Sequence, residues 1–573
     1  MVYSLKVVTS STCRLSKETV AEAVEEREEK ETEMSDVVFG IAASAKLWEK
    51  RKKYIKVWYR ENEMRGVVWV DAAVKTEEKE GLPPVMISGD TSGFAYSNRQ
   101  GQRSGIRISR IVSETVRLGL KGVRWVVMGD DDTVFVAENL VRVLRKYDHR
   151  EMYYIGSLSE SHLQNIFFSY GMAYGGGGFA ISYPLAVALE KMQDRCIQRY
   201  PSLYGSDDRM HACMAELGVP LSKEIGFHQY DVYGNLLGLL GSHPVAPLVS
   251  LHHIDVVEPI FPNMSRVEAL EHLTIPMKLD SASLIQQSIC YDKNRKWTIS
   301  VSWGYAVQIF RGIFSAREIE MPSRTFLNWY RRADYTAYAF NTRPVTRNPC
   351  QKPFVFYFSK AKLNSTLQQT VTEYERHRVP HPECRWKMAD PSALDRVVVY
   401  KKQDPRLWDR APRRNCCRVM KSNKKGSVEI DVGVCRDAYL RRTVTHLLVS
   451  DYFSDIFRDP SAPSLGGLRA ASPRYFRLSA LSNDGLCGNG ARGGGSDGPN
   501  SGGSDGSNSD GGDKWPLLSW YSSLLGKYPV LVKALTSAIL TLFGDLWRTR
   551  EERLLAATVI PKLGVSLEWQ CNR

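Results

Sequence analysis

The sequence has no apolar run near its start, no Cys-x-x-Cys pair, and no Gly-Lys-Ser/Thr triplet after a glycine-rich turn. These absences argue, in turn, against a polytopic membrane protein, a zinc finger and a phosphate-binding P-loop. Internal repeats are absent too. Hydrophobic residues make up 43% and charged residues 24%, the balance of an ordinary globular protein. Collagen, a small disulfide toxin and a chain disordered throughout are therefore excluded.

Basic residues exceed acidic ones, since 77 Lys and Arg against 63 Asp and Glu give a formal charge of +14. This excess favours anionic partners such as nucleotides, nucleic acid or a membrane surface, without choosing among them. The 573 residues leave room for roughly three to four domains, or for two with long tails.

Composition divides the chain into five segments. We expect a polar, disordered leader over 1–36, a catalytic domain over 37–275, a β-rich extension over 276–450, a linker over 451–513 that is Gly/Ser-rich from 485, and a short apolar segment over 514–573. The linker composition is that of a flexible, disordered chain. The extension is rich in alternating aromatic stretches such as 297–303 and 353–358, which predict antiparallel strands.

The segment 37–275 has an α/β pattern. Short apolar runs at 37–43, 67–70, 85–88 and 125–128 predict buried strands, and helical spacing predicts helices over 46–60, 106–120 and 135–147. Strands that alternate with helices indicate a mostly parallel sheet. Ligands of such sheets bind beyond the carboxyl ends of the strands, so we look there for the chemistry.

Four of the eleven cysteines, Cys384, Cys416, Cys417 and Cys435, fall in one short stretch and predict a disulfide cluster in an oxidising compartment. Buried free thiols are the alternative. The glycosylation sequons at Asn263 and Asn364 point to the same compartment. No signal peptide or membrane anchor opens the sequence, however, and a missing upstream exon would resolve this conflict.

Three carboxylates, Asp130, Asp131 and Asp132, follow the predicted strand 125–128 directly. Adjacent carboxylates repel one another, and a hard divalent cation such as Mg²⁺ or Mn²⁺ neutralises them and can bridge to a diphosphate. The alternative is an acidic cap for a helix beginning near Val134. An EF-hand loop is excluded because Phe135, not glycine, occupies its sixth position.

Three further motifs follow the triplet. The glycines of 175–178 leave backbone amides bare for a substrate, or form a mobile turn. Asp207 and Asp208 precede a helical stretch and can supply a general base or a helix cap. His252 and His253 end a short apolar strand, where one imidazole can supply a metal ligand or be structural.

Taken in order, the motifs strand-DDD, GGGGFA, SDD and SLHH resemble those of plant fringe-like members of glycosyltransferase family 31. The resemblance covers Val37 to at least Leu273. It implies a Rossmann-like nucleotide-diphospho-sugar transferase fold (GT-A type) and an inverting, UDP-sugar-dependent enzyme. The segment from Phe39 through the basic helix 46–60 corresponds to the nucleotide side of that family.

The resemblance also implies roles for residues. Asp132, Asp130 and His252 would hold Mn²⁺ (or Mg²⁺), with His253 the less favoured ligand, and Asp208 or Asp207 would deprotonate the acceptor hydroxyl. The implied contacts of the nucleotide sugar are Asp130, Asp131, Asp90, Gly176, Gly177, Gly178, Ser44 and Arg51. Ordinary turn and surface roles are the alternative for Asp90, Ser44 and Arg51.

The implied partners are a UDP-sugar donor and a glycan or glycoprotein acceptor, with no nucleic acid. A membrane-associated place in the Golgi or secretory lumen is expected. Residues 514–545 instead resemble the start of small four-helix membrane proteins of peroxisomes and mitochondria, which we attribute to an adventitious fusion; a genuine anchor or an amphipathic helix is the alternative. A DxD phosphatase is a further alternative, because Asp130-x-Asp132 follows an apolar strand.

Overall fold

The computed structural model describes residues 31–76, 80–330, 335–380, 383–422 and 424–435. All described residues belong to one compact unit, which lies within Met1–Ala462. The predicted linker 451–513, the apolar segment 514–573 and most of the leader lie outside the described residues. Within the described ranges, no helix combines the length and the apolar character that a membrane crossing requires.

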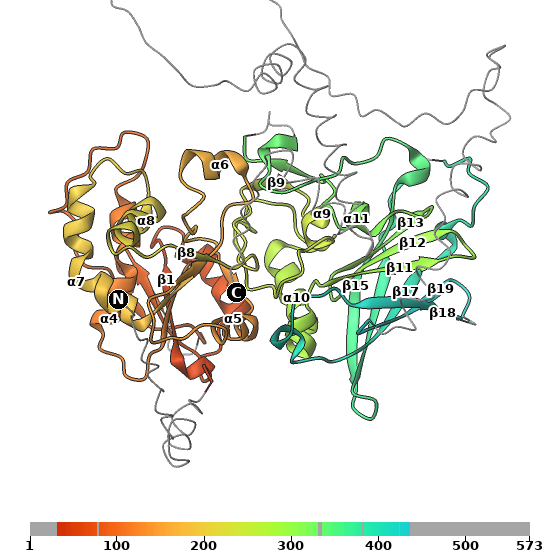
Figure 1. Ribbon diagram of the computed structural model, residues 1–573, viewed down its shortest axis with the longest axis horizontal. Helices are drawn as coiled ribbons and strands as arrows, with labels where there is room; N and C mark the ends of the chain where they lie inside the picture. The colour runs from red at the N-terminus through yellow and green to blue at the C-terminus, as the bar shows by residue number, and fades with distance from the viewer. Residues whose placement is uncertain (1–30, 77–79, 331–334, 381–382, 423, 436–573) are drawn as a thin grey trace, which may run out of the picture. The chain divides into compact units, whose positions relative to one another are not determined.

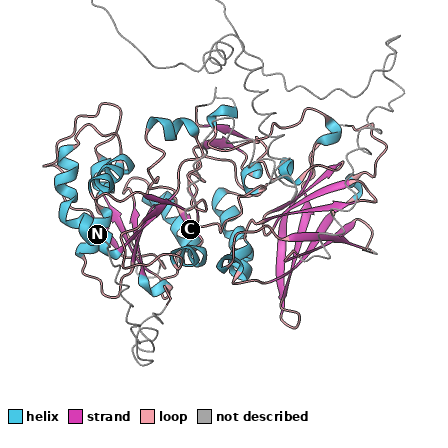
Figure 2. Ribbon diagram, viewed as in Figure 1, coloured by secondary structure: helices cyan, strands magenta, loops and turns pink. Residues whose placement is uncertain are grey.

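A seven-stranded sheet forms the centre of the N-terminal half (Figures 1 and 2). Its strands, in spatial order, are β3 (Val85–Ile87), β2 (Arg65–Val70), β1 (Val37–Ala42), β4 (Trp125–Asp130), β7 (Phe179–Ser182), β6 (Tyr154–Gly156) and β8 (Leu221–Lys223). All neighbours are parallel except β7, which runs antiparallel to both β4 and β6. Every residue of β1 is buried, as expected for a strand covered on both faces.

Side chains of β4 alternate between two apolar layers. Trp125 and Val127 pack with residues of α2 (Trp48–Trp58) and α5 (Ala137–Leu144), whereas Val126 and Met128 pack with residues of α3 (Ser104–Ser109), α4 (Ile111–Arg117), α7 (Tyr183–Arg199) and α8 (Ser206–Glu216). Figure 1 shows α4, α7 and α8 on one side of the sheet and α5 on the other. The sheet, with its helices on both faces and its mostly parallel order, confirms the predicted GT-A type fold.

One predicted helix is wrong in detail. Residues 106–120 form α3 and α4 instead of a single helix, and the break lies at Arg110. The hydroxyl of Ser109 donates a hydrogen bond to the carbonyl of Ile106 at 2.9 Å, which competes with the helical backbone pattern. The apolar spacing continues across the break, and therefore could not indicate it.

The second half contains an eight-stranded sheet (Figure 1). Its spatial order is β11 (Gln287–Asp292), β12 (Trp297–Ser302), β13 (Ala306–Arg311), β15 (Phe354–Asn364), β16 (Gln369–Arg376), β17 (Arg396–Lys402), β19 (Ser427–Gly433) and β18 (Cys416–Met420). Neighbours are antiparallel except β17 and β19. Helix α10 (Arg266–Asp280) precedes this sheet, and the domain boundary predicted between 275 and 276 falls inside it.

The end of the predicted leader belongs to the fold. Residues 34–36 form a short 3-10 helix, and Thr32 is buried. Its carbonyl accepts a hydrogen bond from Arg145 Nε at 2.9 Å. The expectation of a disordered leader is therefore wrong for residues 31–36, because these contacts tie them to α5 and the sheet.

Four disulfides join the described cysteines: Cys196–Cys213, Cys290–Cys417, Cys350–Cys384 and Cys416–Cys435. The predicted cluster is thus oxidised, but only Cys416 and Cys435 pair within it. The adjacent Cys416 and Cys417 point to opposite faces of β18, since successive side chains alternate along a strand. They therefore reach different partners.

Candidate active site

The acidic triplet lies at the carboxyl end of the central strands. Strands β1 and β4 are parallel, with Ala42 opposite Asp130, and the chain then turns into β5 (Val134–Phe135). Thr133 closes this turn, since its hydroxyl accepts a hydrogen bond from the backbone N–H of Asp130 at 2.8 Å. Helix α5 begins only at Ala137, so the interpretation of the triplet as a helix cap is wrong.

The middle carboxylate of the triplet faces the nucleotide side expected from the sequence. Asp131 accepts hydrogen bonds from the backbone N–H of Ser44 at 3.3 Å and from Arg51 Nη1 at 3.0 Å. Arg51 Nη2 also lies 2.9 Å from Asp255 and 3.2 Å from Asp132. Ser44, Arg51 and Asp131 therefore form one ion-paired corner, and Arg51 holds the acidic turn in position.

A second small sheet brings the distant histidine to the triplet. Strand β10 (Ser250–Leu251) pairs antiparallel with β5, and Leu251 lies opposite Val134. The next residue, His252, therefore reaches the acidic turn. Its Nε2 atom is 3.3 Å from Asp132 Oδ1 and 3.8 Å from Asp130 Oδ2. The predicted ligands thus converge, although more than a hundred residues separate them in sequence.

Asp130, Asp132 and His252 fit a divalent metal ion. Each offers one ligand atom, and these atoms lie within 4.8 Å of one another. Ligands about 2.1 Å from an ion lie at most about 4.2 Å apart, and both measured separations from His252 satisfy this limit. Asp132 is fully buried, and neither of its carboxylate oxygens accepts a hydrogen bond from the described residues. Arg51 supplies one positive charge to this buried carboxylate at Oδ2, and a metal ion would supply positive charge at Oδ1, the oxygen that faces His252.

The protonation states agree with a metal site. Burial, and then the neighbouring Asp132, raise the pKa of Asp130 well above its ordinary value although Arg51 opposes them, and a bound cation would lower it. Burial, together with His253, lowers the pKa of His252. The imidazole of His252 is therefore neutral, as a metal ligand must be.

Two residues that the sequence did not indicate orient the histidine. Gln229 Oε1 accepts a hydrogen bond from His252 Nδ1 at 2.9 Å, and Gln229 Nε2 donates to Asp231 at 3.1 Å. Because Nδ1 carries the proton, the lone pair of Nε2 faces the carboxylates. His253 points elsewhere, and its Nδ1 atom pairs with Asp231 at 3.1 Å. No sequence motif could have identified Gln229 or Asp231, since only the fold brings them behind His252.

The glycine-rich loop packs tightly against this cluster. A Cβ atom on Gly176 would lie 2.0 Å from the His252 ring, and one on Gly175 would lie 2.7 Å from Asp207. Gly178 has a positive φ of 84°, which side-chain-bearing residues rarely adopt. Close packing therefore requires glycine at these positions, which the residue types alone do not indicate. Contact of Gly176, Gly177 and Gly178 with a donor stays a prediction.

We expect Gly176→Ala to weaken divalent-cation binding by about ten- to a hundredfold, because the new methyl group must displace the His252 ring. Titration calorimetry with Mn²⁺ measures this change. The matched control is Gly177→Ala, whose Cβ would lie 3.3 Å from the nearest atom, the backbone nitrogen of Gln229. Equal affinities of the two variants would contradict the proposed position of His252.

Asp207 and Asp208 are adjacent in sequence, but their carboxylates have different hydrogen-bond partners. Asp208 accepts hydrogen bonds from the backbone N–H groups of Tyr204 at 2.6 Å and Gly205 at 2.9 Å, so it caps the start of α8. Asp207 accepts from Ser206 Oγ at 3.0 Å and from the backbone N–H of Gly175. Burial raises the pKa of Asp207 to about 6. Asp207, and not Asp208, therefore faces the glycine-rich loop.

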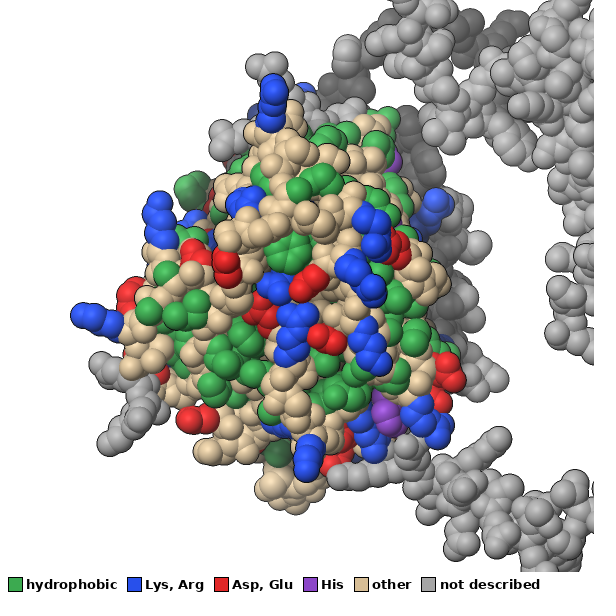
Figure 3. Space-filling view, turned by 90° about the vertical axis from the view of Figure 1, so that its left-hand side faces the viewer, with side chains coloured by type: hydrophobic (Ala, Val, Ile, Leu, Met, Phe, Trp, Pro, Cys, Tyr) green, Lys and Arg blue, Asp and Glu red, His purple; other side chains and the backbone are tan. Residues whose placement is uncertain are grey.

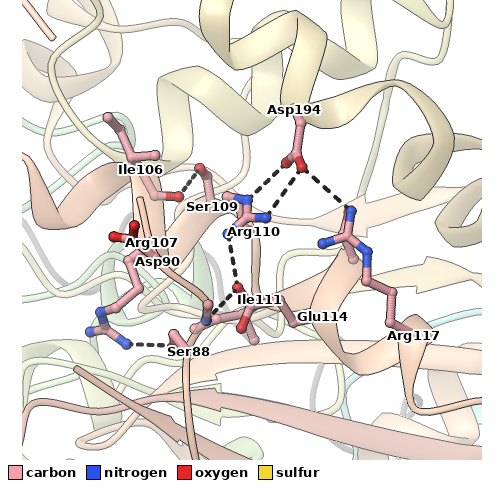
Figure 4. A network of polar contacts seen from close by, with 12 residues as sticks. Ser88, Asp90, Ile106, Arg107, Ser109, Arg110, Ile111, Glu114, Arg117 and Asp194 are labelled. Carbon is pink, nitrogen blue, oxygen red and sulfur yellow. Dashed lines mark hydrogen bonds and ion pairs between the residues drawn. The ribbon is translucent and has the colours of Figure 1, made fainter. Parts of the chain in front are cut away.

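The structure leaves Asp90 apart from the cluster. It lies exposed on the loop after β3, and its carboxylate accepts hydrogen bonds from the hydroxyl and the backbone N–H of Ser92. Within the described ranges, no contact joins Asp90 to the triplet. A polar network fixes this loop: Arg107 donates to Ser88 at 3.3 Å, and the backbone N–H of Gly89 donates to Glu114 (Figure 4). A uridine contact of Asp90 stays a prediction.

Two family models match the chain. Residues 32–236 match the model described as Fringe-like, and residues 164–417 match the model described as a protein of unknown function, DUF604. The chain therefore carries a Fringe-like segment over residues 32–236. The Fringe-like match contains the acidic triplet, the glycine-rich loop and Asp207, and the second match adds His252 and most of the second sheet. A comparison with curated proteins finds no match.

Solved structures similar to this chain include an active-site mutant of LgtC, at 14% identity and a TM-score of 0.28, covering 41% of this chain and 94% of that chain. The galactosyltransferase LgtC in complex with donor and acceptor sugar analogs aligns at 14% identity and a TM-score of 0.27, covering 41% and 95%. Scores of this size carry no argument about the site. The assignment of the site rests instead on the strand order and on the positions of Asp130, Asp132 and His252.

Proposed function

We propose that the chain transfers a sugar from a UDP-sugar to an acceptor hydroxyl, with inversion at the anomeric carbon. The observation that supports this proposal is the convergence of Asp130, Asp132 and His252 beside Asp207 at the carboxyl edge of the sheet. A divalent ion held there would supply positive charge to a departing diphosphate. Mn²⁺ is the proposed ion, with Mg²⁺ the alternative.

Asp207 is the proposed general base. The glycine-rich loop lies against both groups, since a Cβ atom on Gly175 would meet Asp207 and one on Gly176 would meet the His252 ring. One base on the acceptor side, opposite the leaving group, suits a single displacement and therefore inversion. Asp208, the other residue that the resemblance implies, is less suited to this role, because its two oxygens cap α8.

A donor screen tests the proposed function. The purified full-length chain is incubated with a panel of UDP-sugars and Mn²⁺, and released UDP is measured with and without EDTA. The proposal expects release from at least one donor that EDTA abolishes, and NMR of the product should give the inverted anomeric configuration. Phosphate release from p-nitrophenyl phosphate without any UDP-sugar turnover would favour the DxD phosphatase instead.

The proposed partners and location follow from the same reaction. A glycan or glycoprotein acceptor in the Golgi or secretory lumen is consistent with four disulfides, which persist in oxidising compartments. On the face of Figure 3, basic, acidic and apolar side chains are interspersed without a continuous basic surface. The absence of a nucleic-acid partner stays a prediction. Membrane association, whether in this pathway or in peroxisomes or mitochondria, stays a prediction.

The pH dependence of transfer should follow Asp207. A base with a pKa of about 6 is protonated and inactive at lower pH, so we expect kcat/KM to rise with pH and level off above about 6. The positive charge of a bound cation lowers the pKa of a nearby carboxyl group, which places the midpoint at or below this value. The profile is measured as UDP release at saturating Mn²⁺ from about pH 4.5 to about pH 8, a range that brackets the pKa of the proposed base. A rate that falls steadily as the pH rises from about 5 would contradict the role of Asp207.

A further inference from the structure

A group of exposed aromatic side chains lies close in sequence to the proposed base, Asp207. Helix α6 (His162–Phe167) carries Phe167, whose side chain is 61% exposed, and the chain continues into Phe168. Tyr204, which is 40% exposed, lies three residues before Asp207. The ring centroids of Phe167 and Phe168 are 4.8 Å apart, and those of Phe168 and Tyr204 are 5.5 Å apart. We call Phe167, Phe168 and Tyr204 the aromatic platform.

The platform is continuous with the reaction site. Phe168 contacts Tyr174, whose ring centroid lies 6.3 Å away and which directly precedes the glycine-rich loop. Tyr174 is only 5% exposed, and its hydroxyl has no hydrogen-bond partner among the described residues. Burial raises the pKa of Tyr174, and the nearby carboxylates of Asp231 and Asp207 raise it further. An unsatisfied hydroxyl therefore lies between the platform and the proposed base.

The second half of the chain fixes the platform in place. The amide of Asn328, on β14 (Phe326–Asn328), donates to Ser161 Oγ at 3.2 Å, and Ser161 caps α6. Strand β14 also pairs with β9 (Val232–Gly234), and Figure 1 shows α6 close to β9. The start of α6 is thus anchored by β14, a strand that itself pairs with β9.

The two segments that build the platform carry no fixed charge. Residues 161–175 and 201–206 contain no Asp, Glu, Lys or Arg, although such residues make up 24% of the chain. The ring of His211 faces Gly171 of this region, and burial lowers its pKa, so it is neutral as well. These two segments themselves offer no counter-ion to a charged ligand; the exposed Arg99 lies on the separate loop whose Gly101 packs against the backbone of Tyr204. An uncharged occupant is therefore favoured.

We propose that the aromatic platform is the acceptor subsite and that it binds an uncharged pyranose ring. The C–H face of such a ring is apolar and packs against aromatic side chains, while its hydroxyl groups stay free for Tyr174 and Asp207. Exposed aromatic clusters are costly in water and mark binding surfaces. This proposal rests on the proposed transfer reaction, since it assigns the acceptor to the side where the base lies.

Saturation-transfer NMR on the full-length chain tests the platform with methyl pyranosides as probes. The panel holds the neutral glucoside, galactoside, mannoside, xyloside and N-acetylglucosaminide, and the glucuronide is the charged counterpart of the glucoside. We expect at least one neutral probe to bind better than the glucuronide. Phe167→Ala combined with Tyr204→Ala should weaken that binding by about tenfold. Tyr200→Ala, an exposed aromatic side chain at the end of α7, is the matched control and should leave binding unchanged.

Three results would overturn the proposal: no neutral probe binds, the double variant binds as the unaltered chain does, or the glucuronide binds best. Loss of self-association in the double variant, measured by sedimentation, together with unchanged probe binding would assign the platform to a chain contact instead. Mn²⁺-dependent UDP binding is measured in parallel and should be the same in all variants. If the unaltered chain lacks UDP binding but retains neutral-sugar binding at the platform, the transfer reaction fails while the sugar site stands.

Discussion

Replacing Asp132 with alanine or asparagine is expected to abolish divalent-cation binding and, with it, metal-dependent UDP binding. Asp132 is the most buried of the proposed ligands, and its two oxygens accept no hydrogen bond from the described residues. Asparagine keeps the shape of this side chain but loses its charge, and Arg51 retains its ion pairs with Asp131 and Asp255. Titration calorimetry with Mn²⁺, followed by UDP in the presence of Mn²⁺, measures both losses.

The neighbouring carboxylate provides the control for this result. Asp131 faces Ser44 and Arg51 instead of His252, so Asp131→Asn should reduce Mn²⁺ affinity by less than about tenfold. Thermal unfolding, monitored by circular dichroism, checks that each variant folds. A folded Asp132→Asn variant with unchanged Mn²⁺ affinity would remove the basis of the proposed mechanism.

The position of the metal site could be predicted because it depends on short-range signals. The run of buried residues in β1 and β4 and the carboxylates after β4 are contiguous in sequence. Alternation of strands and helices then fixes the edge of the sheet at which they lie. His252 required the family resemblance, because its approach depends on the pairing of the two-residue strands β5 and β10. Strands this short leave almost no sequence signal.

Other features depend on geometry that residue types do not encode. Gln229 became recognisable only when the fold placed it 2.9 Å from His252. The close approach of Gly176 to the His252 ring is likewise a contact between distant segments. The pairing of Cys290 with Cys417 spans 127 residues, so spacing could suggest that the cysteines are oxidised but not which ones pair.

The choice between Asp207 and Asp208 was also open in the sequence, since either one can cap a helix that begins at Ser206. The third residue of a helix is the one whose side chain reaches back to the preceding backbone N–H groups. Asp208 occupies that position and uses both oxygens there. Asp207 is left to face the glycine-rich loop, and the two residues can therefore be separated by experiment.

Asp207→Asn should lower kcat for transfer by about 10² to 10⁴ while leaving Mn²⁺-dependent UDP binding intact, because the amide cannot accept the acceptor proton. The acid limb of the pH profile should disappear as well, since the group that titrates near pH 6 is gone. Asp208→Asn should do the opposite: it weakens the cap of α8 at a cost of about 1 kcal/mol in the free energy of unfolding and keeps most of the activity. Single-turnover UDP release and thermal unfolding measure the two effects. If Asp208→Asn lost transfer at unchanged stability while Asp207→Asn remained active, the base would be Asp208, and the hydrogen bonds that now cap α8 would have to break during the reaction.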